Sequence, residues 1–154
     1  PFPHCRVCGI FVSMAHRPLA LLSAYIHHTD ATGLDALASM VSLARRSTPL
    51  LLVGPDANGH SSWGAPPHTS TNIVGSHIEE FILASHLGIA NHWPCPPTYR
   101  GDMPSHVSWI DVTLTSIPLA PFVTSRRVLS DTTLDSEHSL LECTLSPGVS
   151  CVCD

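Results

Sequence analysis

The stretch Leu50-Leu51-Leu52-Val53-Gly54-Pro55-Asp56-Ala57-Asn58-Gly59 begins as a short apolar run and ends in polar, turn-forming residues. A continuous apolar run of this length is typical of a strand buried on both faces of a sheet. Functional groups of an open α/β sheet gather just beyond such strand ends, because the loops there converge. We therefore expect Asp56 and Asn58, two positions apart on one side of an extended segment, to address one phosphate together.

Two later segments supply the other groups that such a site needs. Asp111 lies within the apolar segment Trp109–Leu114, and a buried Asp usually has a partner. His138 suits that role, because a carboxylate orients an imidazole and stabilises its protonated form. Glu137 beside it is a candidate outer metal ligand. Taken alone, Gly54–Gly59 is better explained by a tight turn, but the three sets in this order favour metal-assisted attack on a phosphodiester.

The rest of the chain predicts a layered α/β domain. The expected elements are a hairpin of Val7–Val12 and Leu19–Ile26, a helix from Leu34 to Arg46, a strand at Leu50–Val53, a helix around Ile78–Ile82, a short strand at Gly88–Ala90, and strands at Val107–Leu114 and Ser139–Leu145. We assign residues 1–145 to this domain and residues 146–154 to a tail.

Composition limits the class of protein. The 154 residues are 44% hydrophobic and 12% charged, which fits one globular domain. All seven basic residues are arginine, and the net charge is −5, which counts against a stable DNA-binding module more than against an enzyme that holds its substrate briefly. The eleven His are scattered and expected on the surface. No segment approaches the roughly 18 apolar residues of a membrane span, so we expect an intracellular, soluble protein without a membrane partner.

The cysteines allow two interpretations. Cys5 and Cys8 have a C-x2-C spacing and could bind zinc together with Cys151 and Cys153. However, the segment around Cys5 and Cys8 also fits a strand, and Cys-x-Cys is an uncommon ligand spacing. Free buried thiols are the favoured interpretation.

Four motifs resemble the endonuclease/exonuclease/phosphatase superfamily, and more specifically the endonuclease domain of non-LTR (LINE-type) retrotransposons. Residues 50–64, LLLVGPDANGHSSWG, are similar to the family segment LLLxGDxNAHSxxWG, and residues 109–116 match xIDLTLxS. Residues 136–138, Ser-Glu-His, stand where the family has Ser-Asp-His, and residues 97–99 where it has Pro-Thr-Phe. The likeness runs from about Leu19 to Leu145 and implies a DNase I-like four-layer α/β sandwich.

The resemblance also implies a role for each candidate residue. Tyr25 would contact the phosphate, Asp56 would activate or position the attacking water, Asn58 would bind the scissile phosphate, Asp111 would orient His138, and Glu137 and Asp56 would lie at the metal, normally Mg²⁺ with Mn²⁺ as the alternative. His60, Trp63 and Arg100 are candidate DNA contacts, although each is equally explained as a loop-packing residue.

The implied substrate is DNA, nicked to leave a free 3′ hydroxyl that primes reverse transcription. A reverse transcriptase fused to the chain or encoded with it would then be a partner, and the nucleus the site of action in a eukaryote.

Three departures from the family pattern affect these expectations. Family members place an Asn and a metal-binding Glu upstream of the Tyr25 segment, whereas the first acid here is Asp30. We therefore expect the C-terminal two thirds of the usual fold, an incomplete sandwich that is inactive or weakly active by itself. Glu137 replaces the usual Asp, which moves the carboxylate by one methylene, and Pro55 separates Gly54 from Asp56. The alternatives are a phosphatase of the same superfamily that acts on a small phosphoester, and a non-catalytic relic or binding domain.

Overall fold

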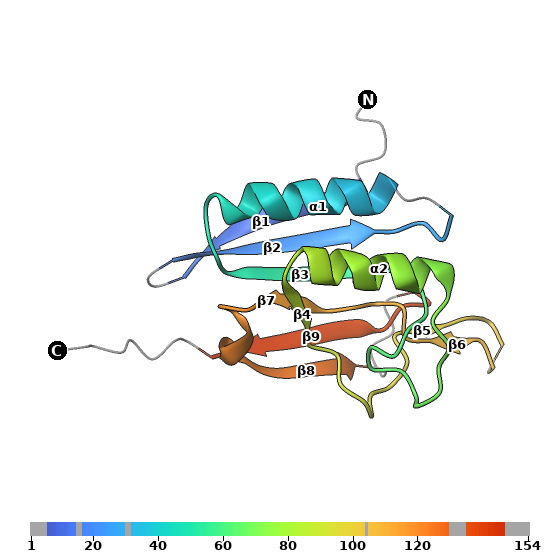
Figure 1. Ribbon diagram of the computed structural model, residues 1–154. Helices are drawn as coiled ribbons and strands as arrows, with labels where there is room; N and C mark the ends of the chain where they lie inside the picture. Colours follow the sequence, from blue (N-terminus) through green and yellow to red (C-terminus); the bar gives the residue numbers. More distant parts are fainter. Residues whose placement is uncertain (1–5, 15–16, 30–31, 104, 130–134, 147–154) are drawn as a thin grey trace.

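The computed structural model describes residues 6–14, 17–29, 32–103, 105–129 and 135–146 (Figure 1). The predicted tail at 146–154 falls outside these ranges except for Ser146, whose N–H donates to the carbonyl oxygen of Phe122. The boundary at residue 145 therefore stays a prediction.

The described chain is a mixed α/β structure, as predicted. Its elements are β1 (Val7–Ser13), β2 (Pro18–Tyr25), α1 (Thr32–Arg45), β3 (Leu51–Asp56), α2 (Ile73–Ala84), β4 (Leu87–Ile89), β5 (Tyr99–Arg100), β6 (Val107–Ser108), β7 (Leu114–Ser116), the 3-10 helix η1 (Ala120–Phe122), β8 (Val123–Leu129) and β9 (Leu140–Leu145). The main sheet has the order β1-β2-β3-β7-β4, in which only the β2–β3 pair is parallel. Strands β5–β6 and β8–β9 form two separate two-stranded sheets. Neither described helix is both long and apolar enough to span a membrane.

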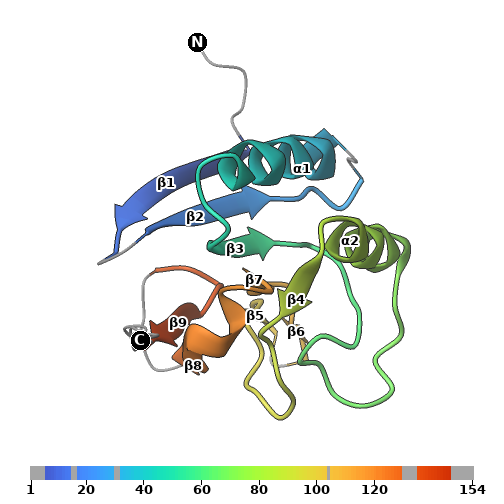
Figure 2. The ribbon, with the colours of Figure 1, turned by 60° about the vertical axis from the view of Figure 1, so that its left-hand side comes forward.

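The elements stack in layers. Helices α1 and α2 cover one face of the main sheet, and the β8–β9 sheet lies on the other side (Figures 1 and 2). Between the helices and the sheet lie aliphatic side chains that are at most 1% exposed, among them Leu37, Val41, Leu51, Val53 and Ile78. Burying each such side chain stabilises the fold by about 1.5–3 kcal/mol, so this interface fixes β3 in the middle of the sheet.

The first half of the chain folds as the sequence predicts. The hairpin, the helix beginning near Leu34 and the central apolar strand are all present. Strand β3 is longer than predicted, because it continues to Asp56 instead of ending at Val53. The parallel pairing of Tyr25 with Asp56 extends it, so Asp56 is held by the sheet and is not part of a free turn.

The predicted strand Val107–Leu114 is wrong as a continuous element. Its ends belong to β6 and β7, and between them Asp111 forms only an isolated bridge with Asp56 at the end of β3. There Asp111 N–H donates to the Thr98 hydroxyl at 3.0 Å. Strand β8 was not predicted, because the polar run Ser125-Arg126-Arg127 interrupts its apolar alternation.

The cysteine interpretation is only partly supported. Cys95 and Cys143 are free and half-buried, whereas Cys8 is free and exposed on β1. Cys5, Cys151 and Cys153 of the zinc alternative lie outside the described residues.

The loop after β3 is held tightly against the start of α2. Asn72, the residue that caps α2, accepts hydrogen bonds from the N–H groups of His60 at 3.1 Å and Gly75 at 2.8 Å. A Cβ atom at Gly75 would lie 2.0 Å from the His60 carbonyl oxygen. Only glycine therefore permits this approach, which fixes the path of the chain from Asn58 to His60.

We expect Gly75→Ala to destabilise the protein, because the added methyl group would push the loop away from α2. Overpacking of this kind typically costs about 1–3 kcal/mol. Gly54→Ala is the matched control, since a Cβ there meets nothing within 4 Å. Urea denaturation should give an unfolding free energy that falls for Gly75→Ala and changes by less than about 0.5 kcal/mol for Gly54→Ala. Equal stability of the two variants would contradict this packing.

Candidate active site

The carboxyl ends of β2 and β3 meet the β5–β6 sheet and the start of β9 at one end of the molecule (Figure 1). An open pocket of about 380 Å³ lies there. Its lining residues are Tyr25, Asp56, Asn58, His60, Tyr99, Ser108, Ile110 and His138. The structure thus places residues from five separate segments around one cavity.

Asp56 and Asp111 face each other in an isolated antiparallel bridge. Two backbone hydrogen bonds flank the bridge, from Ala57 N–H to the Ile110 carbonyl at 2.8 Å and from Val112 N–H to the Pro55 carbonyl at 3.0 Å. Because both bonds are between backbone groups, the separation of the two carboxylates is set by the fold.

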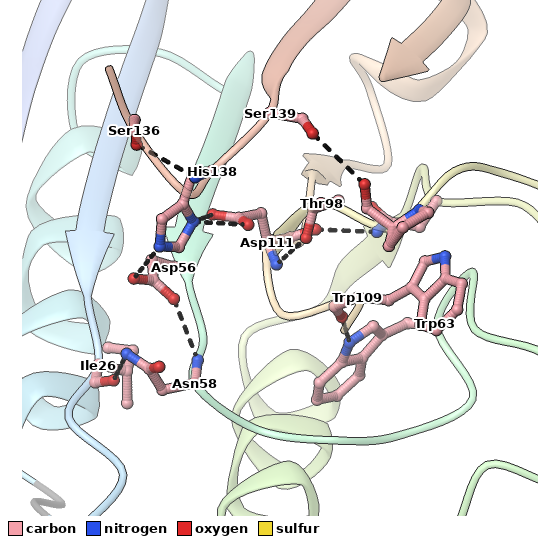
Figure 3. Close-up of polar contacts among 12 residues, drawn as sticks. Ile26, Asp56, Asn58, Trp63, Thr98, Trp109, Asp111, Ser136, His138 and Ser139 are labelled. Carbon is pink, nitrogen blue, oxygen red and sulfur yellow. Dashed lines mark hydrogen bonds and ion pairs between the residues drawn. The ribbon is translucent and has the colours of Figure 1, made fainter. Parts of the chain in front are cut away.

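His138 lies between the two carboxylates (Figure 3). Its Nδ1 is 3.0 and 3.2 Å from the two carboxylate oxygens of Asp111, and its Nε2 is 3.8 Å from Oδ2 of Asp56. The His138 backbone N–H donates to the Ser136 hydroxyl at 3.1 Å. The backbone of His138 also forms an isolated antiparallel β-bridge with that of Tyr99. The Asp111 carboxylate thereby orients the ring and leaves Nε2 directed toward Asp56 and the pocket.

The site holds two partly buried carboxylates beside one imidazole. The side chains of Asp56, Asp111 and His138 are 19%, 14% and 35% exposed. Burial, followed by the charge of Asp111, raises the pKa of the Asp56 carboxyl, while His138 and the Asn58 N–H act in the opposite direction. Removing water and adding a neighbouring like charge both disfavour an ionised carboxyl. A cation or a proton at Asp56 would relieve this cost.

Asn58 is held in a conformation that few residues adopt. Its φ of 45° is in the left-handed region, which Asn tolerates better than most residues. Its side-chain amide donates to the Ile26 carbonyl at 3.0 Å, and its backbone N–H donates to Asp56 Oδ1 at 3.3 Å. An amide group has two N–H donors and one oxygen, so one donor and the oxygen are left for a ligand in the pocket.

Tyr25, at the end of β2, also lines the pocket and is 46% exposed. The candidates Asp56, Asn58, Asp111, His138 and Tyr25 are therefore brought together, with Asp111 behind the imidazole. Their proximity alone does not assign a chemical role to each of them.

Three supporting residues were missed by sequence reasoning. Thr98 is fully buried and accepts the Asp111 N–H. The side chains of Asn91 and Arg126 both donate to the Asp111 carbonyl, at 3.1 and 3.3 Å, and burial lowers the pKa of the Arg126 guanidinium. Thr98 lies in the quoted Pro-Thr-Tyr segment, which could have indicated it, whereas Asn91 and Arg126 belong to no local pattern.

Tyr99 was also missed, and it changes the interpretation of Glu137. The Tyr99 ring packs edge-on against His138, with centroids 5.2 Å apart. A side-chain hydrogen bond to Glu137 is the main cause that raises the pKa of the Tyr99 hydroxyl. Glu137 is exposed, and its carboxylate does not belong to the group formed by Asp56, Asp111 and His138 among the described residues. Glu137 thus lies outside the group of described residues that could hold a metal ion, and its metal role stays a prediction.

The three candidate DNA contacts differ in their surroundings. His60 is exposed and lines the pocket, whereas Arg100 is exposed on β5 and follows the pocket-lining Tyr99 in the sequence. Trp63 is only 3% exposed, and its indole N–H donates to the Trp109 carbonyl at 3.1 Å. The prediction that Trp63 contacts DNA is wrong, because the ring belongs to the hydrophobic core.

The donor atoms at the site suit a divalent cation. One ligand atom from each of Asp56, Asp111 and His138 lies within 4.8 Å of the other two. Carboxylate and amide oxygens favour Mg²⁺ and Mn²⁺. Because both Asp111 oxygens already approach the imidazole, the Asp56 carboxylate is the more available ligand of the two acids.

Solved structures with this fold are nucleases and a phosphatase. The endonuclease domain of TRAS1, a telomere-specific non-LTR retrotransposon, superposes with a TM-score of 0.75 at 19% identity, covering 91% of this chain and 63% of its own. The 3′ phosphatase NExo from Neisseria, bound to a product DNA hairpin, gives 0.71 at 15% identity, covering 94% and 66%. The 3′-5′ exonuclease NExo from Neisseria meningitidis gives 0.66 at 13% identity, covering 83% and 61%. The chain thus spans less than two thirds of the length of each.

Sequence comparison agrees with the fold. No curated protein sequence is significantly similar to the chain. The family model described as endonuclease-reverse transcriptase matches residues 19–142, which include every proposed site residue. The chain therefore belongs to the endonuclease-reverse transcriptase family and has the DNase I-like fold of the endonuclease/exonuclease/phosphatase superfamily.

Proposed function

We propose that this chain supplies the phosphate-handling part of a metal-dependent endonuclease that hydrolyses a phosphodiester bond of DNA. The observation that carries the proposal is the alignment of Asp111, His138 and Asp56 beside an open pocket that Asn58 and Tyr25 also line. The TRAS1 neighbour is an endonuclease domain, and the Neisseria phosphatase is bound to a DNA hairpin.

The proton transfers follow from the geometry. Asp56 is partly buried with a raised pKa, which makes its carboxylate a stronger base for a water proton than an exposed one. His138 would donate its Nδ1 proton to the Asp111 carboxylate, so a second proton taken up by the ring would lie on Nε2, which faces the pocket. The protonated ring would stabilise negative charge on the phosphate oxygens during attack.

Asn58 and Tyr25 would position the substrate. The free amide N–H of Asn58 and the exposed Tyr25 hydroxyl can each donate to a phosphate oxygen. Asn58 is fixed by its bond to Ile26, so the phosphate would be held at a defined distance from Asp56. Orientation of this kind is a large part of catalytic power.

Asp56 and Asn58 would hold the cation, which we propose to be Mg²⁺, with Mn²⁺ able to replace it. When bound, the metal would neutralise charge that develops on the phosphate and on the leaving oxygen. The resulting nick would leave a 3′ hydroxyl. Because the family description includes reverse transcriptase, we propose that such an enzyme, fused to the chain or encoded with it, extends that end on nuclear DNA.

A second candidate is removal of a phosphate from the 3′ end of DNA. The Neisseria neighbour is a 3′ phosphatase, and the pocket here is open enough to admit a strand end. The same residues would act on a phosphomonoester, so the two candidates differ only in which substrate is cleaved.

We expect the chain to nick supercoiled plasmid in Mg²⁺ only slowly, in keeping with the weak activity expected of it by itself, and Asp56→Asn, Asp111→Asn and His138→Gln each to slow nicking further, by at least about 100-fold. Each change removes a group that moves a proton or orients the ring. Agarose gels would measure nicking, and release of phosphate from a 3′-phosphorylated oligonucleotide would measure the second candidate.

Asp35→Asn is the matched control, because Asp35 is an exposed acid on α1. It should nick at the wild-type rate. Absence of nicking by the wild-type chain, or equal rates in all variants, would contradict the endonuclease proposal, and phosphate release without nicking would favour the phosphatase.

Asp56→Asn should also raise the stability of the protein at neutral pH. Because the pKa of Asp56 is raised by folding, the stability due to its protonated form is lost as the pH rises through the folded-state pKa. A neutral Asn avoids that loss. Thermal melts should therefore show Asp56→Asn above wild type at about pH 7, with the gap closing toward about pH 3, where the unfolded carboxyl is also largely protonated. A lower melting temperature for Asp56→Asn at pH 7 would be inconsistent with this sign.

A further inference from the structure

Arg126 on β8 reaches the site from the β8–β9 sheet, which is separate from the main sheet. Its guanidinium donates to the Asp111 carbonyl at 3.3 Å through Nη2 and to the Thr113 hydroxyl at 3.3 Å through Nε. Its Nη1 lies 3.9 Å from the Cys95 thiol. This one half-buried side chain therefore ties the second sheet to the segment that carries Asp111.

The Asp111 backbone lies outside the regular strands and is held largely by side chains. It forms only an isolated bridge with Asp56. Its N–H donates to the Thr98 hydroxyl at 3.0 Å. Its carbonyl accepts from the Asn91 amide at 3.1 Å as well as from Arg126. Of these three supporting side chains, Arg126 is the one that carries a charge.

That charge acts on the same residue that the hydrogen bond holds. Burial lowers the pKa of the Arg126 guanidinium, whereas Cys95 and then Asp111 act in the opposite direction, and an arginine stays protonated in either case. A positive charge beside Asp111 attracts its carboxylate and offsets part of the repulsion from Asp56. The attraction is stronger than it would be in water, because the groups are partly buried.

We infer that Arg126 is a positioning residue of the site, which holds Asp111 in the place from which its carboxylate orients His138. It acts through the Asp111 peptide and through its charge. It does not touch the substrate, because it is not among the described residues that line the pocket. The inference rests on the proposed function only in taking nicking of DNA as one of its two readouts.

A displaced Asp111 would lose its place against the imidazole, because His138 is held by other contacts. The N–H of the next residue, Ser139, donates to the Thr98 carbonyl at 2.8 Å. A shift of the Asp111 peptide would therefore lengthen the 3.0 Å contact between the Asp111 carboxylate and Nδ1 of His138. A misplacement of about 1 Å can cost roughly 100-fold in rate. Asn91 keeps its own bond to the carbonyl, so we expect a smaller loss here.

The test compares Arg126→Gln with Arg127→Gln, its matched control on the same strand. Arg127 pairs with Glu142 at the surface, where the side chains are 63% and 39% exposed, and such a pair contributes little to stability. In nicking of a DNA duplex in Mg²⁺, Arg126→Gln should lower kcat by about tenfold and leave KM within about twofold of wild type, since only the orientation of the reacting groups is lost. Arg127→Gln should match wild type in both constants.

The ring ¹⁵N signals of His138, recorded without metal and at one fixed pH, give a readout that needs no activity. Arg126→Gln should move them in the direction in which Asp111→Asn moves them, because both changes weaken the contact at Nδ1. Arg127→Gln should leave them in place. A side chain that only stabilised the fold would lower the midpoint of urea unfolding without moving these signals and without separating kcat from KM.

Arg126→Lys is the conservative variant, and it also serves if Arg126→Gln does not fold. Lysine keeps the charge, but it lacks the rigid fork with which arginine bonds the Asp111 carbonyl and the Thr113 hydroxyl together. Its kcat should therefore lie between those of wild type and Arg126→Gln, about threefold below wild type. Where only Arg126→Lys folds, wild-type kcat together with wild-type His138 signals would overturn the inference.

The results separate this positioning role from the proposed function. A folded Arg126→Gln that equals wild type in kcat and in the His138 signals overturns the positioning role. If the His138 signals move but wild type nicks no DNA, the positioning role stands and the proposed function fails. If wild type nicks DNA and neither readout responds to Arg126, only the positioning role fails.

Discussion

The antiparallel bridge between Asp56 and Asp111 is the constraint on which the rest of the site depends. Backbone hydrogen bonds on both sides of the bridge hold two carboxylates close together at the edge of the core, where burial and mutual repulsion oppose ionisation. The imidazole of His138 lies between them and offsets part of that cost. Holding the two carboxylates together therefore destabilises the folded state at this point. Burial of apolar side chains in the layers around β3 offsets that cost.

Much of this arrangement could be predicted from local sequence. The apolar run before Asp56 predicts a central strand, and an Asp in an apolar segment together with a distant His predicts a partnership. A site residue can be predicted in this way when its type and its position at the end of a strand already indicate its chemistry. The helix from Leu34 and the β1–β2 hairpin were predicted for the same reason, since their periodicity is local.

The remainder depends on contacts between distant segments. The Thr98 side chain makes one hydrogen bond to the backbone around Asp111 and the Asn91 side chain makes two, and no spacing in the sequence predicts such bonds. The sequence places Trp63 in a polar loop, where an exposed ring is expected, but in the structure its side chain is buried in the core. Glu137 was assigned by its place beside His138, but neighbours on an extended segment point to opposite sides, and its carboxylate is not in the group formed by Asp56, Asp111 and His138 among the described residues.

The central claim is that Asp111 fixes the orientation and proton of His138, and ¹⁵N NMR of the histidine rings tests it most directly. In wild type, neutral His138 should carry its proton on Nδ1, donated to the carboxylate 3.0 Å away, and Asp111→Asn should shift the ring toward the Nε2–H form common in water. An Nε2–H ring in wild type, unchanged by the substitution, would contradict the account.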